Sequence, residues 1–303
     1  MKKFVIHTGW KLKPEPSPYI LYVDNPLESE EKIFELTTGK NLNIEIESDE
    51  KKICIGYNTF NGERISCVYQ EEIASNKIQC QSCSLNEFYT CRVICQGDFC
   101  HPSSEEAKKH CWETKANVYL THIAGKVKVG SSTSPFRRWL DQGSDAGVCI
   151  AEGVGLEPRA VEYRIGLKLA YPMAIRISQK MKLLGKPTDQ ETIINDLKIA
   201  VNEVYDSIQS EIMIPKEKLL PITFLDELYG EIPLLETRPL IKKIGKDNFH
   251  FSGKIVGVKG SIVVVKNEQT YYAFDLHSLI GRNAHISDEK IEMKGQRSLF
   301  DFV

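Results

Sequence analysis

The sequence predicts a mixed α+β protein, with a central β-β-α-β-α unit beside a cysteine-rich module and flanked by small β modules. Three observations support this fold class. Short runs of alternating apolar and polar residues lie near both ends, and six of the nine cysteines fall between Cys80 and Cys111. The segment from Ile194 to Ile212 carries apolar residues three or four apart, as a helix with one apolar face does. With 303 residues and 42% hydrophobic content, the chain has room for two or three compact units.

Residues 1–75 are expected to form an N-terminal β module. Lys3–Ile6 and Tyr19–Val23 are rich in β-forming residues, and Leu42–Glu47 alternates apolar with polar side chains. Asn61-Gly62 is a hairpin turn signal. We find no chemistry-bearing motif in this segment.

Residues 76–113 are predicted to form a zinc module. Cys80-Gln-Ser-Cys83 is a CxxC motif, whose two thiolates can share one tetrahedral Zn²⁺. The further candidate ligands downstream are Cys91, Cys95, Cys100 and Cys111, with His101 and His110 nearby. Such a closed, thiolate-rich site is structural, because a catalytic zinc keeps an open position.

The candidate ligands are compatible with more than one zinc arrangement. These residues exceed the four ligands that one ion needs, so one or two ions fit. Buried free thiols or a thiol redox pair are the alternatives. Cys54, Cys67 and Cys149 stand apart in the sequence and are interpreted as packing residues.

Residues 114–235 are expected to hold the central unit and the helices that follow it. A turn at Ala124-Gly125 and Pro135 at the first position of a helix, with the flanking β-rich and helical runs, predict two strands, a helix, a third strand and a second helix. The predicted elements are Val118–Ile123, Val127–Val129, Ser134–Asp141, Cys149–Val154 and Pro158–Leu169. A further helix is expected from its apolar stripe, Ile194, Leu197, Val201, Val204, Ile208 and Ile212.

The C-terminal part is expected to hold a second β module at 238–286, in which Ile262–Val265 is the clearest strand. Residues 287–303 are charged and sparse in apolar residues, as expected of a flexible tail. No apolar run approaches the length of a spanning helix, so no membrane partner is expected. We therefore expect a cytoplasmic protein.

Charge is distributed unevenly, although the net charge is only −2. Between residues 114 and 188 the chain carries twelve Lys or Arg against five acids, and acidic stretches lie on either side. Such a basic centre suits nucleic acid phosphate, and an ordinary solvated surface is the alternative.

The two strands predicted at Val118–Ile123 and Val127–Val129 form a hairpin that carries Tyr119 and Lys128-Val129-Gly130, and Arg138 and Glu162 lie on the two predicted helices that follow. This arrangement resembles the GIY-YIG nuclease superfamily. Tyr119 matches the tyrosine of the first motif, and Lys128-Val129-Gly130 matches the second, with Lys128 in place of its tyrosine. Arg138 matches the family's helix arginine, and Glu162 matches its glutamate. Gln142 lies where many members have His or Tyr. The resemblance covers residues 117 to about 170, and extends to a little-characterised archaeal and bacterial family allied to the superfamily.

This resemblance implies a metal-dependent DNA endonuclease with a catalytic set of Tyr119, Lys128, Arg138 and Glu162. Glu162 would hold Mg²⁺ or Mn²⁺, which completes its coordination with water and phosphate oxygens. Tyr119 would act as the base, with its pKa lowered by Lys128 across the hairpin. Alternatively, a desolvated Lys128 would itself be the base. The expected nucleic-acid contacts are Lys126, Arg137, Arg138 and Gln142. The lost second tyrosine favours the alternative of an inactive fold that binds DNA as an adaptor.

The last eight residues are Gln296-Arg-Ser-Leu299-Phe-Asp-Phe302-Val303. They resemble the clamp-binding peptide (PIP box) presented to PCNA, the sliding clamp. A short helical turn would bring Gln296, Leu299 and Phe302 to one side, with Val303 at the usual second aromatic position. The resemblance implies PCNA as a partner, a role in DNA replication or repair at the nucleoid, and an archaeal source. Alternatively, the tail folds back onto the protein, or the protein acts on RNA and the peptide is fortuitous.

Overall fold

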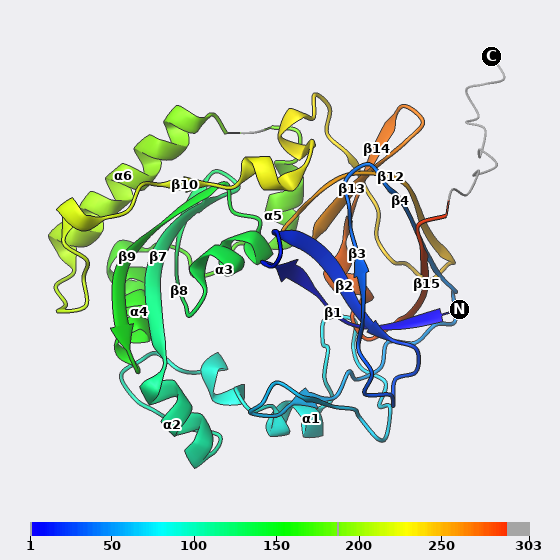
Figure 1. The fold of residues 1–303 in the computed structure, drawn as a ribbon, viewed down its shortest axis with the longest axis horizontal. Coiled ribbons are helices and arrows are strands. Elements are labelled where there is room, and N and C mark those ends of the chain that lie inside the picture. Colours follow the sequence, from blue (N-terminus) through cyan, green and yellow to red (C-terminus); the bar gives the residue numbers. More distant parts are fainter. Residues whose placement is uncertain (1, 187, 290–303) are drawn as a thin grey trace.

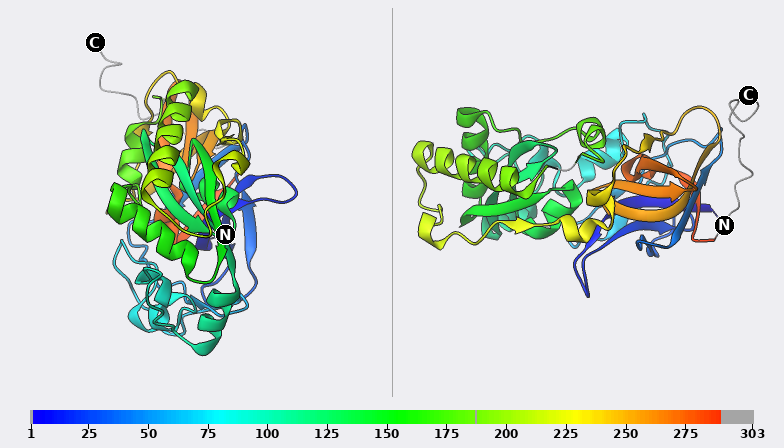
Figure 2. Two further views of the ribbon diagram at one scale, coloured as in Figure 1. Left: turned by 90° about the vertical axis from the view of Figure 1, so that its left-hand side faces the viewer. Right: turned by 90° about the horizontal axis from the view of Figure 1, so that it is seen from above.

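The computed structural model describes residues 2–186 and 188–289 and has a mixed α+β fold (Figure 1). It consists of a nine-stranded sheet, a four-stranded central sheet with helices, and a cysteine-rich segment that connects them. Seen from above, the central unit and the nine-stranded sheet lie side by side (Figure 2). No helix within the described residues is both long enough and apolar enough to span a membrane.

The nine-stranded sheet combines strands from both ends of the chain. Its order is β11-β14-β13-β12-β4-β15-β1-β2-β3. These strands are β1 (Lys2–Lys11), β2 (Ser17–Val23), β3 (Lys32–Glu35), β4 (Asn41–Ile46), β11 (Leu240–Ile241), β12 (Phe249–Lys259), β13 (Ile262–Asn267), β14 (Thr270–Asp275) and β15 (Asn283–Ser287). The two β modules expected from the sequence are therefore one sheet, because β4 pairs with both β12 and β15.

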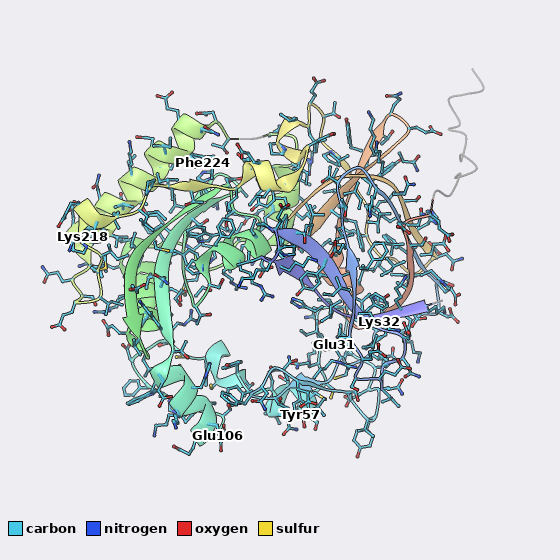
Figure 3. The ribbon with its side chains drawn as sticks, in the orientation of Figure 1. Glu31, Lys32, Tyr57, Glu106, Lys218 and Phe224 are labelled. Atoms are coloured by element: carbon cyan, nitrogen blue, oxygen red, sulfur yellow. The ribbon has the colours of Figure 1, made fainter. Side chains whose placement is uncertain are left out.

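The cysteine-rich segment, residues 54–113, contains little regular structure. Its elements are β5 (Tyr57–Asn58), β6 (Arg64–Ile65), α1 (Gln81–Asn86), the 3₁₀ helix η1 (Thr90–Val93) and α2 (Glu105–Glu113). In Figure 3, Tyr57 marks the hairpin of β5 and β6, and Glu106 marks α2 at the opposite end of the segment. Four cysteines form its small core, so a cofactor is a reasonable source of its stability.

The central sheet has the order β10-β9-β7-β8, with all neighbours antiparallel. Its strands are β7 (Lys115–Ile123), β8 (Lys126–Ser132), β9 (Ala146–Val154) and β10 (Thr223–Phe224). The helices are α3 (Pro135–Gln142), α4 (Glu157–Leu169), α5 (Ile177–Lys182) and α6 (Gln190–Ser207). The 3₁₀ helices after residue 210 are η2 (Lys216–Lys218), η3 (Asp226–Tyr229), η4 (Ile232–Leu234) and η5 (Leu276–Leu279). The order β7-β8-α3-β9-α4 agrees with the order predicted for this segment.

Helix α6 is shorter than its predicted apolar stripe. It ends at Ser207, and its fully buried residues are Ile193, Leu197, Ala200 and Val204. Ile194 is only half-buried, because the buried stripe runs one residue earlier at the helix start. Both α4 and α6 contribute to the hydrophobic core on one face of the central sheet.

The opposite face of the central sheet shares a core with the nine-stranded sheet. Tyr119 of β7 and Trp139 of α3 belong to this second core, together with residues of β4, β12 and β13. Trp10 of β1 packs edge-on against Tyr229, with ring centroids 5.8 Å apart. Because apolar residues run continuously across the boundary, the two sheets are joined by a packed core.

Candidate functional site

Four buried cysteines form a group that could hold a metal ion such as zinc. The sulfur atoms of Cys54, Cys67, Cys80 and Cys83 all lie within 4.8 Å of one another. A tetrahedral Zn²⁺ with bonds of about 2.3 Å needs sulfur atoms about 3.8 Å apart, so small adjustments suffice. The interpretation of Cys54 and Cys67 as mere packing residues was wrong. They complete a four-thiol group with the CxxC pair.

Backbone N–H groups point at the sulfur atoms of this cysteine group. The amides of Cys80 and Gly56 donate to Cys54 Sγ at 3.2 and 3.4 Å, and the Cys83 amide donates to Cys80 Sγ at 3.5 Å. Such donors orient and stabilise thiolates that bind metal. A chain fold that aims amides at clustered sulfurs is better suited to thiolates than to neutral thiols.

Thiol acidity within the group is uneven. Burial raises the pKa of Cys54 to about 11 and also raises that of Cys83. Burial opposes ionisation of Cys67 too, but hydrogen bonds from the Glu71 backbone and from Cys54 outweigh it and lower its pKa. A bound cation would supply the positive charge that full deprotonation requires.

The remaining candidate ligands lie elsewhere in the cysteine-rich segment. Cys91, Cys95, Cys100 and Cys111 are half-buried, and none of them belongs to the group around Cys54. Cys95 and Cys111 instead line a cavity of about 430 Å³ beside the central sheet. The cysteine-rich segment therefore forms one wall of this cavity.

The cavity wall on the central unit carries two arginines and several hydroxyl groups. Arg138 of α3 and Arg159 of α4 line it, with the hydroxyl residues Thr114, Ser131, Ser132 and Thr133. Guanidinium and hydroxyl groups are the donors that phosphate oxygens accept best. The cavity is thus chemically suited to an anion.

Glu162 lies beside this cavity with its carboxylate almost fully buried. It is only 4% exposed, and the Ser131 hydroxyl and Arg159 Nη1 both donate to Glu162 Oε2, the latter at 2.6 Å. A carboxylate oxygen is the hard ligand that Mg²⁺ and Mn²⁺ prefer. The residue chemistry therefore fits a single hard cation once the hydrogen bonds from Arg159 and Ser131 to Glu162 Oε2 are released.

Tyr119 and Lys128 lie on the other face of the hairpin. The ammonium of Lys128 lies 5.6 Å from the centroid of the Tyr119 ring, and Tyr119 packs edge-on against Trp139. Tyr119 faces Gly130 across the hairpin, where a Cβ would come within 2.4 Å of its hydroxyl oxygen. The glycine of the second motif is thus required by the close approach of this ring.

β8 is the edge strand of the central sheet, and the candidate residues lie on both of its faces. Ser131 pairs with Val118, whose side chain packs with α4, whereas Lys128 and Tyr119 lie on the α3 side. The Glu162 charge nevertheless acts on both Tyr119 and Lys128. The two faces are therefore electrostatically coupled across β8.

Burial determines the acidity of Tyr119 and Lys128. It raises the pKa of Tyr119 to about 12, although the Arg138 charge acts in the opposite direction. Lys128 was expected to make Tyr119 more acidic; this expectation was wrong, because removal from water dominates. Burial also lowers the pKa of Lys128 to about 8, against an ordinary value of 10.5. Of the two candidate bases, Lys128 is the better suited.

The other predicted nucleic-acid residues lie at three separate places. Gln142 lies beside Tyr119, and its backbone carbonyl accepts from Lys180 at 2.7 Å. Arg137 is exposed and lies 3.7 Å from Asp141, which accepts from the Trp10 amide at the boundary with β1. Lys126 is exposed at the start of β8. Gln296, Leu299, Phe302 and Val303 lie outside the described residues.

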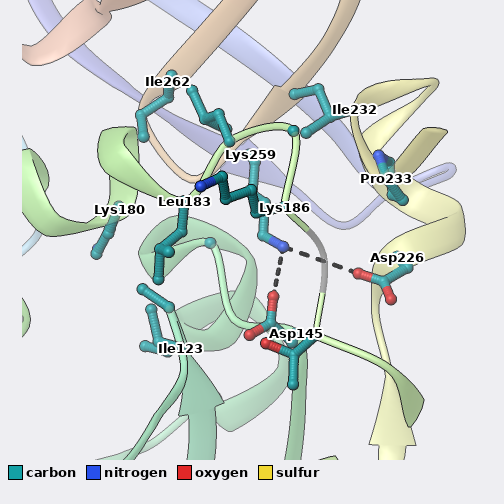
Figure 4. Close-up of a pocket in the computed structure, with 15 residues that line it drawn as sticks. Ile123, Asp145, Lys180, Leu183, Lys186, Asp226, Ile232, Pro233, Lys259 and Ile262 are labelled. Carbon is teal, nitrogen blue, oxygen red and sulfur yellow. Dashed lines mark hydrogen bonds and ion pairs between the residues drawn. The ribbon is translucent and has the colours of Figure 1, made fainter. Parts of the chain in front are cut away.

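A second polar cluster joins the central unit to the nine-stranded sheet. Lys259 of β12 pairs with Asp145 and lies 3.8 Å from Asp226 (Figure 4). Asp145 also forms a hydrogen bond with the fully buried His122. Burial opposes ionisation of Asp145, but Lys259 and His122 outweigh it and lower the pKa. The adjoining cavity measures about 50 Å³, which suits one or two waters. We interpret this cluster as a structural joint.

Sequence reasoning missed Ser131, Arg159 and Cys54 with Cys67 as site residues. Arg159 precedes Glu162 by one helical turn, a spacing that predicts a side-chain contact. Cys54 and Cys67 flank the predicted Asn61-Gly62 turn, which brings the two strands around it together. Both signals were present in the sequence.

One family model matches this chain, described as "Protein of unknown function (DUF2797)", over residues 39–281. The match includes the cysteine-rich segment, the whole central unit and most of the C-terminal strands, but not β1 to β3. No curated protein and no solved structure matches the chain. Since the matched residues make up well over half of the sequence, the chain belongs to the DUF2797 family.

Proposed function

We propose that this protein is a metal-dependent DNA endonuclease of GIY-YIG type that works in replication or repair and docks on PCNA through its C-terminal peptide. The observation that carries the proposal is the cavity lined by Arg138, Arg159 and Ser131, beside which the buried carboxylate of Glu162 accepts hydrogen bonds from Ser131 and Arg159. A positively lined cavity beside one hard metal ligand is what phosphodiester cleavage needs.

Each residue has a distinct role in this proposal. Arg138 is exposed on α3 and holds the phosphate with its planar guanidinium. Glu162 would hold Mg²⁺ or Mn²⁺, which when bound neutralises phosphate charge and acidifies water. Lys128 takes the proton from the attacking water, because its neutral fraction becomes substantial near pH 8. Tyr119 keeps its proton and acts as a hydrogen-bond donor.

The test uses wild type and Glu162→Gln with Mn²⁺ or Mg²⁺ and a panel of branched, flapped and single-stranded DNAs. We expect wild type to cut at least one structure and the Glu162→Gln variant to bind the same DNA without cutting it. Exposed Glu152 forms an ion pair with exposed Lys115 and does not line the cavity, so Glu152→Gln is the matched control and should cut like wild type. Cleavage that survives Glu162→Gln would refute the site assignment.

The same experiment tests a DNA-binding adaptor without nuclease activity. Two observations favour this second function. Lys128 stands in place of the tyrosine of the second motif, and Arg159 forms an ion pair with the carboxylate that would bind the metal, Glu162. If no DNA is cut by wild type but binding persists and falls in Arg138→Ala, the adaptor is the better description. Arg238 is exposed and lies outside the cavity, so Arg238→Ala is the control for that loss.

A further inference from the structure

Arg159 supplies the positive charge that the buried Glu162 carboxylate needs. Their ion pair has an N–O distance of 2.6 Å, and the Glu162 side chain is only 5% exposed. Isolated buried carboxylates are strongly disfavoured, so a countercharge must be present whenever this group is ionised. In the metal-free protein that countercharge is a side chain one turn earlier on α4.

The cysteine-rich segment holds Arg159 in this position. Arg159 Nε donates to the carbonyl of Cys95 at 2.9 Å. Two residues later Gly97 lies directly against α4, where a Cβ would come within 2.2 Å of the Ala160 nitrogen. Gly97 also has φ +90, which favours glycine. The loop thus fixes the stem of the guanidinium and leaves its far end on Glu162.

Arg159 also faces the cavity. Its side chain is 36% exposed and lines the cavity together with Arg138, so it needs no large movement to reach an anion there. Guanidinium groups bind carboxylate and phosphate with the same planar pair of donors. One arginine therefore lies within reach of two competing negative groups.

We propose that Arg159 exchanges partners when substrate binds. In the DNA-free protein it neutralises Glu162, and when a divalent cation takes that carboxylate Arg159 contacts a phosphate in the cavity instead. This inference rests on the proposed function, since it assigns the cation to Glu162. It makes Arg159 both a competitor of the metal and a second phosphate-binding residue beside Arg138.

The first measurement is Mn²⁺ binding without DNA, by titration calorimetry. Arg159→Gln removes the competitor, so we expect Mn²⁺ to bind about tenfold tighter than in wild type. Arg159→Lys keeps the charge and should bind Mn²⁺ nearly as wild type does. Arg159→Gln leaves Glu162 unpaired, which could prevent folding. In that case the Arg159→Met variant, refolded with added Mn²⁺, is used in place of Arg159→Gln. Equal Mn²⁺ affinity in all folded variants would overturn the exchange.

The second measurement is the salt dependence of DNA binding under two conditions. One condition contains Ca²⁺, which replaces Mn²⁺ and permits binding, and the other contains EDTA and no free divalent cation. With the cation, Arg159→Gln should lower the slope of log affinity against log salt by about 1, which is one phosphate contact. With EDTA the slope should equal that of wild type, because Arg159 is then on Glu162. A loss of the same size in both conditions would make Arg159 a permanent phosphate contact and overturn the proposal.

A failure of the partner exchange can be distinguished from a failure of the proposed endonuclease activity. Neither measurement requires cleavage, so both expected results can appear in a protein that never cuts DNA. In that case the partner exchange holds and the endonuclease does not. A double variant, Arg159→Gln with Glu162→Gln, pairs two neutral groups and should bind no Mn²⁺ at this site. Tight Mn²⁺ binding by the double variant would show that the ion binds elsewhere and would overturn the inference.

Discussion

At the residue scale, Lys128 is the side chain of the candidate site whose burial is least favourable in free energy. It is only 4% exposed, and its ammonium donates one hydrogen bond, to the Val129 carbonyl at 3.0 Å. An ammonium has three donors, and burying it with one partner is unfavourable. Methionine or leucine would fill this position at lower cost. A charged group kept where packing alone favours an apolar one is typical of a functional site.

Replacement of Lys128 by Met should therefore stabilise the protein at neutral pH. The folded-state pKa is lowered from 10.5 to about 8, so the unfolded chain binds more protons between these values. The free energy of unfolding of wild type should rise through this window. At about pH 7 the variant should be more stable by on the order of 3 kcal/mol, and the gain should shrink as pH approaches 10.5.

Urea unfolding at several pH values measures this difference. Lys126→Met, an exposed position on the same strand, is the control and should show no such pH dependence. A Lys128→Met variant that is less stable than wild type at every pH would contradict the argument. In that event the lysine contributes to folding through its packed stem, and its role as a base loses its physical basis.

At the element scale, the β5–β6 hairpin and the start of α1 hold the four cysteines of the candidate metal centre. Cys54 and Cys67 lie on either side of the hairpin, and Cys80 caps α1 while Cys83 lies within it. These short elements have almost no apolar core other than the cysteines themselves. A metal ion is the interaction best able to fix them relative to one another.

We expect the purified protein to contain at least one zinc ion per chain. Cys67→Ser should lower the zinc content by about one ion and make residues 54–113 sensitive to protease, because the site loses one of its four ligands. Cys149→Ser is the control, since Cys149 lies in β9 outside the group. Elemental analysis of protein prepared without added metal gives the answer. Less than about half an equivalent of zinc in wild type, with all thiols reactive, would exclude this centre.

At the scale of the whole molecule, the first and last strands of the described residues pair with each other in one sheet. β15 pairs with both β1 and β4, so the described chain returns to its starting strand before residue 290. Figure 1 shows this pairing on the side of the molecule away from the central unit. The last described strand, β15, therefore lies on the side of the molecule away from the central unit.

The C-terminal peptide should bind PCNA. Its Leu299 and Phe302 carry enough apolar surface for roughly 3–5 kcal/mol, from which the cost of ordering the peptide subtracts, so micromolar affinity is expected. Calorimetry of the full protein against the clamp is compared with a truncation after Met293 and with a Leu299→Ala, Phe302→Ala double variant. Equal heats for all three proteins would show that another surface docks, or that the clamp is no partner.

Local signals in the sequence determined the central unit. The Ala124-Gly125 turn and Pro135 at the first position of α3 fixed the order of strands and helices, because these signals act over a few residues. The CxxC pair and the predicted Asn61-Gly62 turn were likewise visible. Such features depend on neighbours in the chain, and the sequence contains all the physics that they require.

Only the tertiary structure decided which distant residues meet. The pairing of β4 with β12 and the grouping of Cys54 and Cys67 with Cys80 join positions far apart in the chain. The high pKa of Tyr119 and the low pKa of Lys128 follow from burial that no local pattern reveals. Contacts between distant segments depend on how whole faces pack, and the energies of many alternative packings differ too little for a single sequence to rank them by inspection.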